Sequence, residues 1–375
     1  MIKEMLTIKV IIIGSGIVGA SAAYHLSRNG IDVTVIDANH EGRASAAGAG
    51  IVCPWITHHK HPDWYTLARR GALYYGELTK ELENDGEWDI GYKQVGALAI
   101  SKEDEVIKQF QAEAMSKRAA ATPEVGDIKR LSGEEARGLF PLLNIEYQAL
   151  YVSGGARVDA HLLCQAMQRA SSLHGAQFVE GKASLTLKNG HVVGAEVNGE
   201  LYACDQIIVT TGAWTNELLS PLHCSIAIKP QRGQIIHFGV KEHITSDWPV
   251  VIPDSSYYML AFDDQRIVVG ATRETGAGFD YRLTAGGVKE VIEAGLEMAA
   301  SLENSSISEM RVGFRPMGPD TLPLLGKLQG HHNVTIATGL GPSGITMGPY
   351  IGVVASEIAL NHTLPFDLTP YDPLR

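Results

Sequence analysis

The sequence predicts a mixed α/β fold of two units, one built on a parallel sheet and one on an antiparallel sheet. Three observations carry this prediction. The chain begins with an apolar strand, a glycine-rich turn and a helix within residues 10–29, and residues 333–360 return to the same order. Between about 229 and 307, apolar and polar residues alternate as they do in antiparallel strands. The second unit is therefore expected to be inserted into the first.

The predicted boundaries divide the chain accordingly. Residues 1–55, 150–225 and 310–375 are assigned to the parallel unit, and residues 56–149 and 226–309 to the antiparallel unit. A chain of 375 residues, 45% of them hydrophobic, is typical of two domains with a sizeable core. Its net charge of −11 argues against nucleic acid or an anionic membrane as the main partner.

Cysteine usage and hydropathy indicate the compartment. The four cysteines form no CxxC pair, which is typical of a reducing environment. No apolar stretch is long enough to span a membrane. We therefore expect a cytoplasmic protein. A peripheral position at the inner face of the membrane and a homo-oligomeric state are both left open.

The first strand, residues 10–13, leads into the pattern GxGxxG. Gly14 is expected to make the tight turn, Gly16 to let a pyrophosphate approach the backbone, and Gly19 to let the helix pack close to the strand. The helix over 17–29 then presents free N–H groups and a partial positive charge to phosphates. The pattern predicts a dinucleotide site.

The second strand, residues 32–36, ends in Asp37, which lies 18 residues after Gly19. A carboxylate at about this distance binds the adenosine ribose hydroxyls in such sites. The loop over 39–50 consists mostly of small residues, which predicts a large ligand against its backbone. A nicotinamide-dependent dehydrogenase would share the first motif but would explain neither this loop nor the glycine cluster near the C-terminus.

The middle of the chain is expected to alternate between helices and strands. A buried strand over 206–214 is expected to join the first sheet. The turn Asn189-Gly190 predicts a hairpin. The other expected elements are helices over 64–83, 102–119 and the end of 155–174, and strands over 95–100, 234–238, 257–262 and 266–270.

A second GxGxxG pattern runs from Gly339 to Gly344. Only 31 residues follow it, too few for another nucleotide-binding unit. A single helix N-terminus aimed at an electron-rich ligand group explains it better, and in a flavoenzyme that group is the N1–C2 carbonyl edge of the isoalloxazine. A surface turn is the alternative.

Arg315 lies just upstream, among apolar residues and three prolines. A guanidinium suits a substrate carboxylate because it donates two parallel hydrogen bonds. A structural pair with Asp320 is the alternative. A local cluster of His58, His59 and His61 lacks the ligand pattern of a metal site, so no metal is expected.

Together these motifs resemble those of the FAD-dependent D-amino-acid oxidase superfamily, nearest to its glycine oxidase and D-amino-acid dehydrogenase branches. The resemblance covers nearly the whole chain. It rests on the two glycine clusters, on Asp37, and on the stretches Arg43-Ala44-Ser45, Ala49-Gly50-Ile51, Thr211-Gly212-Ala213-Trp214, Arg266 to Thr272, and Arg315-Pro316…Pro319-Asp320…Pro323.

The resemblance implies a p-hydroxybenzoate-hydroxylase-like (glutathione-reductase-2) arrangement, with a Rossmann-type FAD-binding domain and an inserted antiparallel substrate domain. It implies noncovalent FAD, since no cysteine follows Cys224. By position, the FAD-binding residues would be Gly14, Gly16, Ile17, Val18, Gly19, Asp37, Ala38, Arg43, Ala44, Ser45, Ala49, Gly50, Ile51, Ser184 through its backbone, Thr211, Gly212, Trp214, Gly339, Leu340, Gly341, Pro342, Ser343, Gly344, Ile345 and Thr346.

For the substrate, the resemblance implies Arg315 as the carboxylate-binding residue, assisted by Tyr258. Tyr257, Ile51 and Arg273 would be further contacts. Arg273 stands where relatives often carry an uncharged residue. It would add a second anion contact for an acidic or N-carboxyalkyl substrate, or it is a solvated arginine at a strand end.

The implied reaction oxidises the C–N bond of an amino acid of the glycine, D-amino-acid or N-alkyl-glycine type by hydride transfer to flavin N5. The imino acid would hydrolyse to an oxo acid, and oxygen or a quinone would accept the electrons. Positioning and cofactor electronics would supply most of the rate. An FAD-binding subunit of an electron-transfer dehydrogenase complex, with little activity alone, is the alternative.

Overall fold

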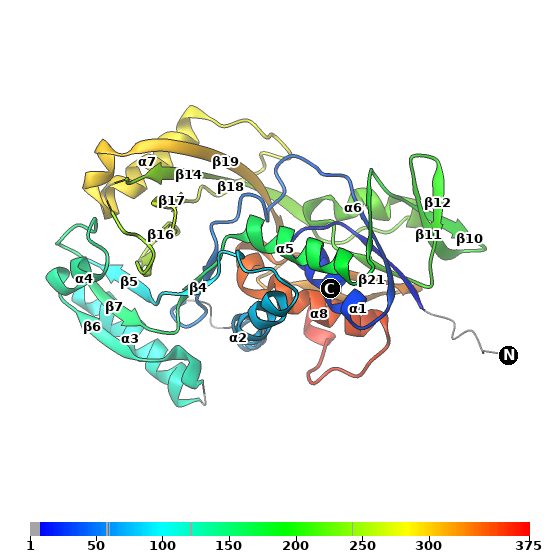
Figure 1. The fold of residues 1–375 in the computed structure, drawn as a ribbon, viewed down its shortest axis with the longest axis horizontal. Coiled ribbons are helices and arrows are strands. Elements are labelled where there is room, and N and C mark those ends of the chain that lie inside the picture. The colour runs from blue at the N-terminus through cyan, green and yellow to red at the C-terminus, as the bar shows by residue number, and fades with distance from the viewer. Residues whose placement is uncertain (1–7, 58, 60, 121, 242) are drawn as a thin grey trace.

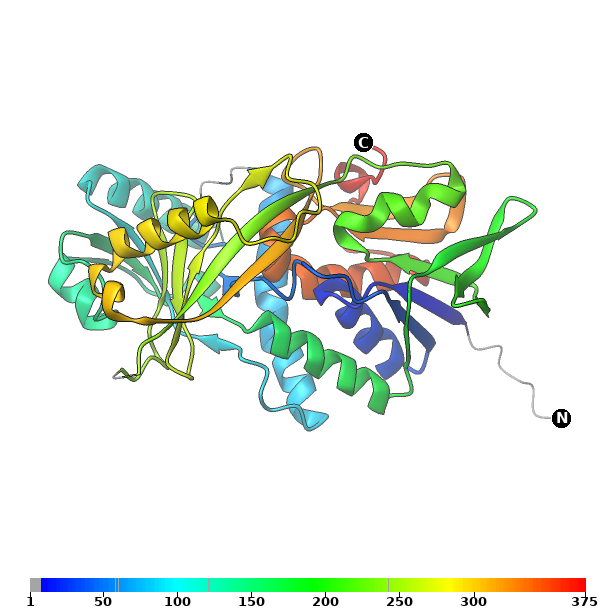
Figure 2. The ribbon, with the colours of Figure 1, turned by 90° about the horizontal axis from the view of Figure 1, so that it is seen from above.

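The computed structural model describes residues 8–375, except residues 58, 60, 121 and 242. Two large sheets dominate the molecule and lie side by side, the antiparallel one on the left of Figure 1 and the parallel one on the right. Figure 2 shows the same arrangement from above. The mixed α/β architecture predicted from the sequence is confirmed.

The parallel sheet has six strands in the order β20-β21-β13-β1-β2-β9, with only β20 antiparallel to its neighbour. It contains both strands of the N-terminal motif and the buried strand expected after residue 206. The strands are β1 (Lys9–Ile13), β2 (Asp32–Asp37), β9 (Gln177–Glu180), β13 (Gln206–Val209), β20 (Leu324–Leu328) and β21 (His331–Thr338).

The two faces of this sheet bury different elements because successive side chains of a strand point to opposite sides. In β1, Val10 and Ile12 belong to one core with the helices, whereas Ile11 and Ile13 belong to another with the small hairpin sheet. The elements are α1 (Ile17–Arg28), α2 (Pro62–Asn84), α5 (Ala160–Leu173) and α8 (Gly344–Ala359) on the first face, and β10 (Ser184–Lys188), β11 (His191–Val197), β12 (Glu200–Ala203) and α6 (Thr215–Leu219) on the second.

The antiparallel sheet has nine strands in the order β18-β14-β17-β16-β15-β5-β7-β6, with β19 also paired to β14. Only the β15–β5 pair is parallel. The strands are β5 (Ala97–Ser101), β6 (Ile128–Leu131), β7 (Gln148–Val152), β14 (Lys229–Gly239), β15 (Val250–Pro253), β16 (Tyr258–Ala261), β17 (Arg266–Gly270), β18 (Glu274–Thr275) and β19 (Ser306–Met317).

The remaining elements are short or lie on the flanks of this sheet. They are the helices α3 (Asp104–Ala119) and α4 (Gly133–Leu139), the small sheet of β3 (Ile51–Val52), β8 (Ala156–Arg157) and β4 (Lys93–Gln94), and the 3-10 turns η1 (Pro123–Val125), η2 (Gly212–Trp214), η3 (Ser220–Leu222), η4 (Ala300–Asn304), η5 (Gly341–Ser343) and η6 (Thr369–Tyr371). Over the part of the chain that the structure describes, no helix is long and apolar enough to cross a membrane.

The expectation of strands throughout 229–307 misses one helix, α7 (Ala285–Met298). Its N-cap is Thr284, whose side chain accepts a hydrogen bond from the Gly287 N–H at 3.2 Å. Val291, Gly295 and Met298 form its buried face. Their helical spacing could have revealed this helix, but the alternation of the flanking strands masked it.

The expected hairpin forms between β10 and β11. Asn189 and Gly190 both have positive φ, 52° and 80°, as the two central residues of a type I′ turn require.

Helix α2 packs on the helical face of the parallel sheet, although the predicted boundaries assign residues 56–149 to the antiparallel unit. Leu67 and Tyr75 are fully buried in the same core as α1 and α8. At Gly71 the backbone of α2 approaches α8 so closely that a Cβ would lie 2.3 Å from the Thr346 carbonyl oxygen. We therefore propose that α2 belongs with the parallel unit, and the rest of the division stays a prediction.

Close packing of α1 against α8 depends on Gly352. A Cβ there would lie 2.5 Å from the Val18 carbonyl oxygen and 2.7 Å from the Ser21 Cβ. We expect Gly352→Ala to lower the free energy of unfolding by about 1–3 kcal/mol, because overpacking outweighs the better helix propensity of alanine. Urea unfolding of the purified protein measures this change.

Gly76 is the matched control, since it lies on the exposed side of α2 and a Cβ there would meet no atom within 4 Å. Gly76→Ala should stabilise the protein by about 0.5–1 kcal/mol. A stabilising Gly352→Ala would contradict the packing argument.

Candidate active site

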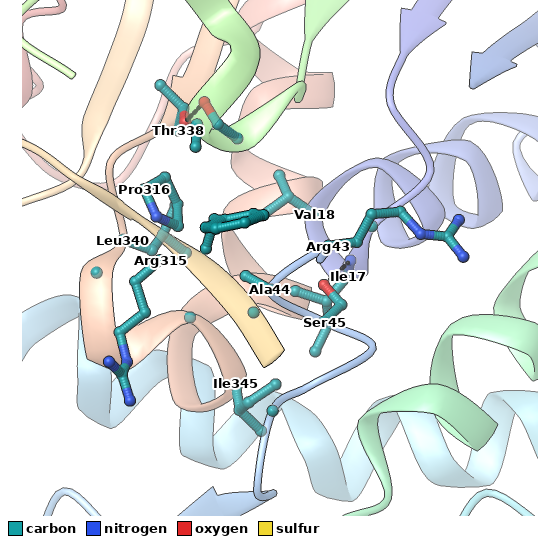
Figure 3. Close-up of a pocket in the computed structure, with 18 of the residues that line it drawn as sticks. Ile17, Val18, Arg43, Ala44, Ser45, Arg315, Pro316, Thr338, Leu340 and Ile345 are labelled. Atoms are coloured by element: carbon teal, nitrogen blue, oxygen red, sulfur yellow. Dashed lines mark hydrogen bonds between the residues drawn. The ribbon is translucent and has the colours of Figure 1, made fainter. Parts of the chain in front are cut away.

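One cavity of about 400 Å³ connects the two units. Its lining begins at the carboxyl ends of β1, β2 and β13 and continues past the N-terminus of α8 to the strands β14, β16 and β19 of the antiparallel sheet. In Figure 3, Ile17 and Ser45 lie on one side of this cavity and Arg315 on the other. A ligand filling it would touch both sheets.

The three glycines of the N-terminal motif have distinct environments. Gly14 has φ of +101°, and a Cβ there would lie 2.6 Å from the Thr210 carbonyl oxygen. A Cβ on Gly19 would lie 1.9 Å from the Gly14 carbonyl oxygen, so the glycine lets α1 pack directly against the turn. A Cβ on Gly16 would meet only the Ser45 Oγ, at 3.2 Å. Gly16 is thus the glycine whose missing side chain leaves space in the cavity.

Asp37 lines the cavity at the end of β2. Its carboxylate accepts hydrogen bonds from the Asn39 N–H at 2.6 Å and from the Ser15 N–H. The guanidinium of Arg43 is 3.8 Å from it. The carboxylate is therefore held in place at the position where a ribose is expected.

The small-residue loop lies between the two units. Ser45 Oγ accepts a hydrogen bond from the Ile17 N–H at 2.9 Å, at the N-terminus of α1. On the other side, the Arg311 side chain donates to the Ala46 carbonyl oxygen at 3.1 Å. A Cβ on Gly48 would lie 2.8 Å from Ile345 Cδ1. A side chain at position 48 would therefore collide with Ile345 at the start of α8.

The second glycine cluster leads through η5 into the N-terminus of α8, and its residues 340–344 line the cavity. The alternative of a surface turn is therefore wrong. Three contacts hold it: the Trp64 indole N–H donates to Ser343 Oγ at 3.0 Å, the Tyr75 hydroxyl to the Ile345 carbonyl oxygen at 2.6 Å, and the Thr346 hydroxyl to the Ile51 carbonyl oxygen at 3.1 Å. The helix N-terminus is thus fixed toward the cavity, where it favours negative charge.

Arg315 reaches the cavity from β19. Its Nη1 donates to the Thr272 carbonyl oxygen at 2.9 Å and to the Gln231 side chain at 3.4 Å. The alternative pair with Asp320 is wrong, because that carboxylate instead binds Arg375 at 2.8 Å. The guanidinium packs against Gly233, where a Cβ would be 2.7 Å from Nη1.

Tyr258 stands beside Arg315 on β16 and also lines the cavity. Burial raises the pKa of its phenol, and the Arg315 guanidinium partly opposes this rise. The phenol is therefore protonated at neutral pH and able to donate a hydrogen bond. A Cβ on Gly270 would lie 2.8 Å from the Tyr258 hydroxyl, so that glycine makes room for it.

Behind Arg315, a polar network fixes Thr272. The Thr272 hydroxyl accepts from the Gln234 N–H at 2.9 Å and donates to the Glu274 carboxylate at 2.7 Å. Glu274 also binds the Gln234 amide at 2.6 Å and the Arg232 Nε at 3.0 Å. Because these groups are buried or half-buried, the carbonyl that orients Arg315 has little freedom to move.

Four aromatic residues from separate segments meet at one wall of the cavity. Trp214 stacks on His40 at 4.7 Å and on Phe279 at 4.9 Å between ring centroids, and Phe314 meets Trp214 edge-on at 6.1 Å. His40, Trp214 and Phe314 line the cavity. Of these four, only Trp214 was predicted as a site residue, because the segments meet only in the folded chain.

Most of the predicted site residues line this cavity, and four do not. Gly19 is packed inside α1, and Gly339 has φ of +74° next to Leu324. Ser184 is exposed at the start of β10, whereas Lys182 and Ala183 just before it line the cavity. Tyr257 hydrogen-bonds Glu290 instead. Arg273 and Ile51 do line the cavity.

The histidine cluster divides. His59 lines the cavity and stacks on Trp64 with ring centroids 4.5 Å apart. His61 lies 3.8 Å from the Asp63 carboxylate. His58 lies outside the described residues. Within those residues, no group of three His, Cys, Asp or Glu side chains could hold a metal ion.

Known proteins are similar to this chain over nearly its whole length. An uncharacterized oxidoreductase of Bacillus subtilis, YurR, is 45% identical over 364 residues, 97% of this chain and 98% of that protein. The crystal structure of an iminodiacetate oxidase from Chelativorans sp. BNC1 is similar with a TM-score of 0.94 at 46% identity, over 97% of this chain and 99% of that chain. The glycine oxidase of Pseudomonas putida is 25% identical, over 97% of this chain and 98% of that protein.

The family model described as FAD dependent oxidoreductase matches residues 9–358, from the first strand to nearly the end of α8. The match spans both glycine clusters and Arg315. The family match identifies the dinucleotide as FAD. The alternative of a nicotinamide-dependent dehydrogenase is therefore wrong. The chain belongs to the DAO family of FAD dependent oxidoreductases.

Proposed function

We propose that this enzyme oxidises the C–N bond of a small amino acid or N-substituted glycine whose carboxylate binds Arg315. The observation that carries the proposal is the placement of Arg315. Its guanidinium is oriented by the Thr272 carbonyl and faces the same cavity as the N-terminal glycine turn. The relatives named iminodiacetate oxidase and glycine oxidase support an amine substrate that carries a carboxylate.

Residues at two ends of the cavity fit two parts of FAD, the pyrophosphate and the flavin. Gly16 leaves space for a pyrophosphate at the N-terminus of α1, and the N-terminus of α8 faces the cavity where a flavin edge would lie. When bound, FAD supplies the acceptor for the hydride that leaves the substrate Cα. The helix dipole of α8 would stabilise the negative charge that accumulates there.

The protein's own part in the reaction is to bind and orient the substrate. Arg315 binds the carboxylate by charge-assisted hydrogen bonds, and the neutral Tyr258 phenol donates a further one. Holding the carboxylate at one place aims the Cα–H bond in one direction, which supplies rate through positioning. No protein base is required in this scheme, because the amine reacts in its neutral form.

The low reactivity of Cys53 supports noncovalent binding of FAD. It is the only cysteine among the described residues that line the cavity. Burial raises the pKa of its thiol to about 11, so the reactive thiolate is scarce at neutral pH.

Purified enzyme tests the proposal. We expect a yellow protein that releases FAD on acid precipitation. Anaerobic addition of the right amino acid should bleach the flavin absorbance with one equivalent of oxo acid formed. Glycine, N-methylglycine, D-alanine, proline and iminodiacetate form the screen. A yellow protein that none of these bleaches would favour the role of an electron-transfer subunit, and a colourless protein that binds no FAD would contradict the proposal.

A further inference from the structure

We propose that Arg273 binds a second carboxylate of the substrate, so that the site selects amino acids with a carboxylate on each side of the amine. The inference rests on the proposed function, because it takes Arg315 as the receptor of the first carboxylate. It assigns a specificity-determining role to a residue outside the stretch of prolines around Arg315.

The charges along the cavity are the first observation. Two carboxylates line it, and both lie at the dinucleotide end: Asp37 accepts backbone N–H groups, and Glu217 pairs with Lys182. At the other end, the charged groups of the described lining are the guanidinium groups of Arg273 and Arg315. In a chain of net charge −11, this end of the cavity carries two positive charges.

The second observation is that no described carboxylate neutralises either arginine. Glu274 follows Arg273 directly, but its carboxylate is occupied by Arg232 at 2.6 Å, by Gln234 at 2.6 Å and by the Thr272 hydroxyl at 2.7 Å. Successive side chains of an extended segment point to opposite sides, so Glu274 lies behind the segment and Arg273 in front of it.

The guanidinium groups of Arg273 and Arg315 also interact electrostatically. Arg273 follows Thr272, whose carbonyl oxygen holds Arg315 at 2.9 Å. Partial burial of the guanidinium and the charge of Arg315 lower the pKa of Arg273. Two neighbouring cations without a counter-ion repel each other, and a ligand that brings two negative charges relieves this repulsion.

Geometry then suggests the class of ligand. Both arginines line the cavity, but Arg315 is half-buried and tied to the Thr272 carbonyl oxygen, whereas Arg273 is the more exposed residue. A substrate with its first carboxylate on Arg315 would extend its second carboxylate toward Arg273. An iminodiacid has this form, with one carboxylate on each arm of a secondary amine. Guanidinium groups can bind both carboxylates by paired hydrogen bonds.

Two matched pairs of small molecules test the inference. Iminodiacetate and N-methylglycine differ as substrates by one carboxylate, and thiodiacetate and (methylthio)acetate are the corresponding ligands without an amine. The variants are Arg273→Gln, Arg273→Lys and, as a control, Arg282→Gln. Arg282 is 83% exposed and lies on the same connection between β17 and α7.

We expect Arg273→Gln to lower the preference for iminodiacetate over N-methylglycine, measured as the ratio of kcat/KM values, by about 10- to 100-fold. Arg273→Lys should retain part of that preference, since it keeps the charge but loses the fork of donors. Arg282→Gln should leave the ratio unchanged. An unchanged ratio in Arg273→Gln would overturn the inference.

Titration of the oxidised flavin absorbance with thiodiacetate and (methylthio)acetate separates this inference from the proposed function. Tighter binding of the diacid that is lost in Arg273→Gln supports the second carboxylate site even if no amine is oxidised. Equal binding of the two acids by the native enzyme overturns it, even if amino acids do bleach the flavin.

Discussion

Replacing Arg315 with lysine is expected to lower kcat/KM for the amino-acid substrate by roughly a hundred- to a thousandfold while FAD remains bound. A lysine keeps the positive charge but cannot donate two parallel hydrogen bonds to a carboxylate. It also cannot keep the bond from Nη1 to the Thr272 carbonyl oxygen while reaching the substrate. Steady-state kinetics together with the flavin content of the purified variant measure the two effects.

Gly233→Ala displaces the same guanidinium without removing it. The new Cβ would lie 2.7 Å from Nη1 and 2.8 Å from Nη2 of Arg315, so the side chain must shift. We expect kcat/KM to fall in the same direction, by about a hundredfold for a displacement near 1 Å. Loss of FAD from either variant, with the substrate affinity of the remaining holoenzyme unchanged, would contradict the carboxylate-binding role of Arg315.

The parts of the site that follow from local rules are the parts the sequence predicts well. Gly14 is required by its positive φ and Gly19 by the contact of α1 with the Gly14 carbonyl oxygen, and these two requirements arise within six residues, although Thr210 also approaches both glycines. Asp37 follows from the length of one strand–helix–strand unit. Such signals need no knowledge of distant segments.

The parts that depend on distant segments could not be predicted in this way. Whether Arg315 pairs with Asp320 is decided by the register of β14 against β19, which sets Gln231 opposite Arg315 and leaves Asp320 to Arg375 at the end of the chain. The contact of Phe279 with Trp214 likewise joins residues from the two units. Their side chains carry no local pattern that announces such a contact.

The role of Arg273 is a third feature that the sequence alone does not decide. The sequence leaves two roles open for Arg273, a solvated arginine at a strand end and an anion-binding arginine. The structure adds where the neighbouring acid goes: Glu274 is bound by Arg232 and Gln234. This arrangement supports the anion-binding role that we propose for Arg273. The sequence does not show which groups bind the nearest carboxylate, and this information is needed to assign a role to the arginine.

Substituting alanine for Gly16 is expected to weaken FAD binding by about 10- to 100-fold while the apoprotein still folds. Gly16 has φ of −66° and ψ of −174°, a conformation that alanine adopts without strain. Within the protein, its Cβ would meet only the end of the Ser45 side chain, at 3.2 Å. The cost of the methyl group should therefore fall on the ligand that approaches this turn.

Gly19→Ala provides the opposite case three residues away. Its Cβ would lie 1.9 Å from the Gly14 carbonyl oxygen and 2.6 Å from the Thr210 Oγ1, so α1 must move away from the turn whether or not a cofactor is bound. This variant should lose about 1–3 kcal/mol or more of apoprotein stability. Urea unfolding of the apoproteins and fluorescence titration with FAD distinguish the two variants. If Gly16→Ala binds FAD as tightly as the native chain, the pyrophosphate does not approach this turn, and the Rossmann-type role of the whole N-terminal motif is wrong.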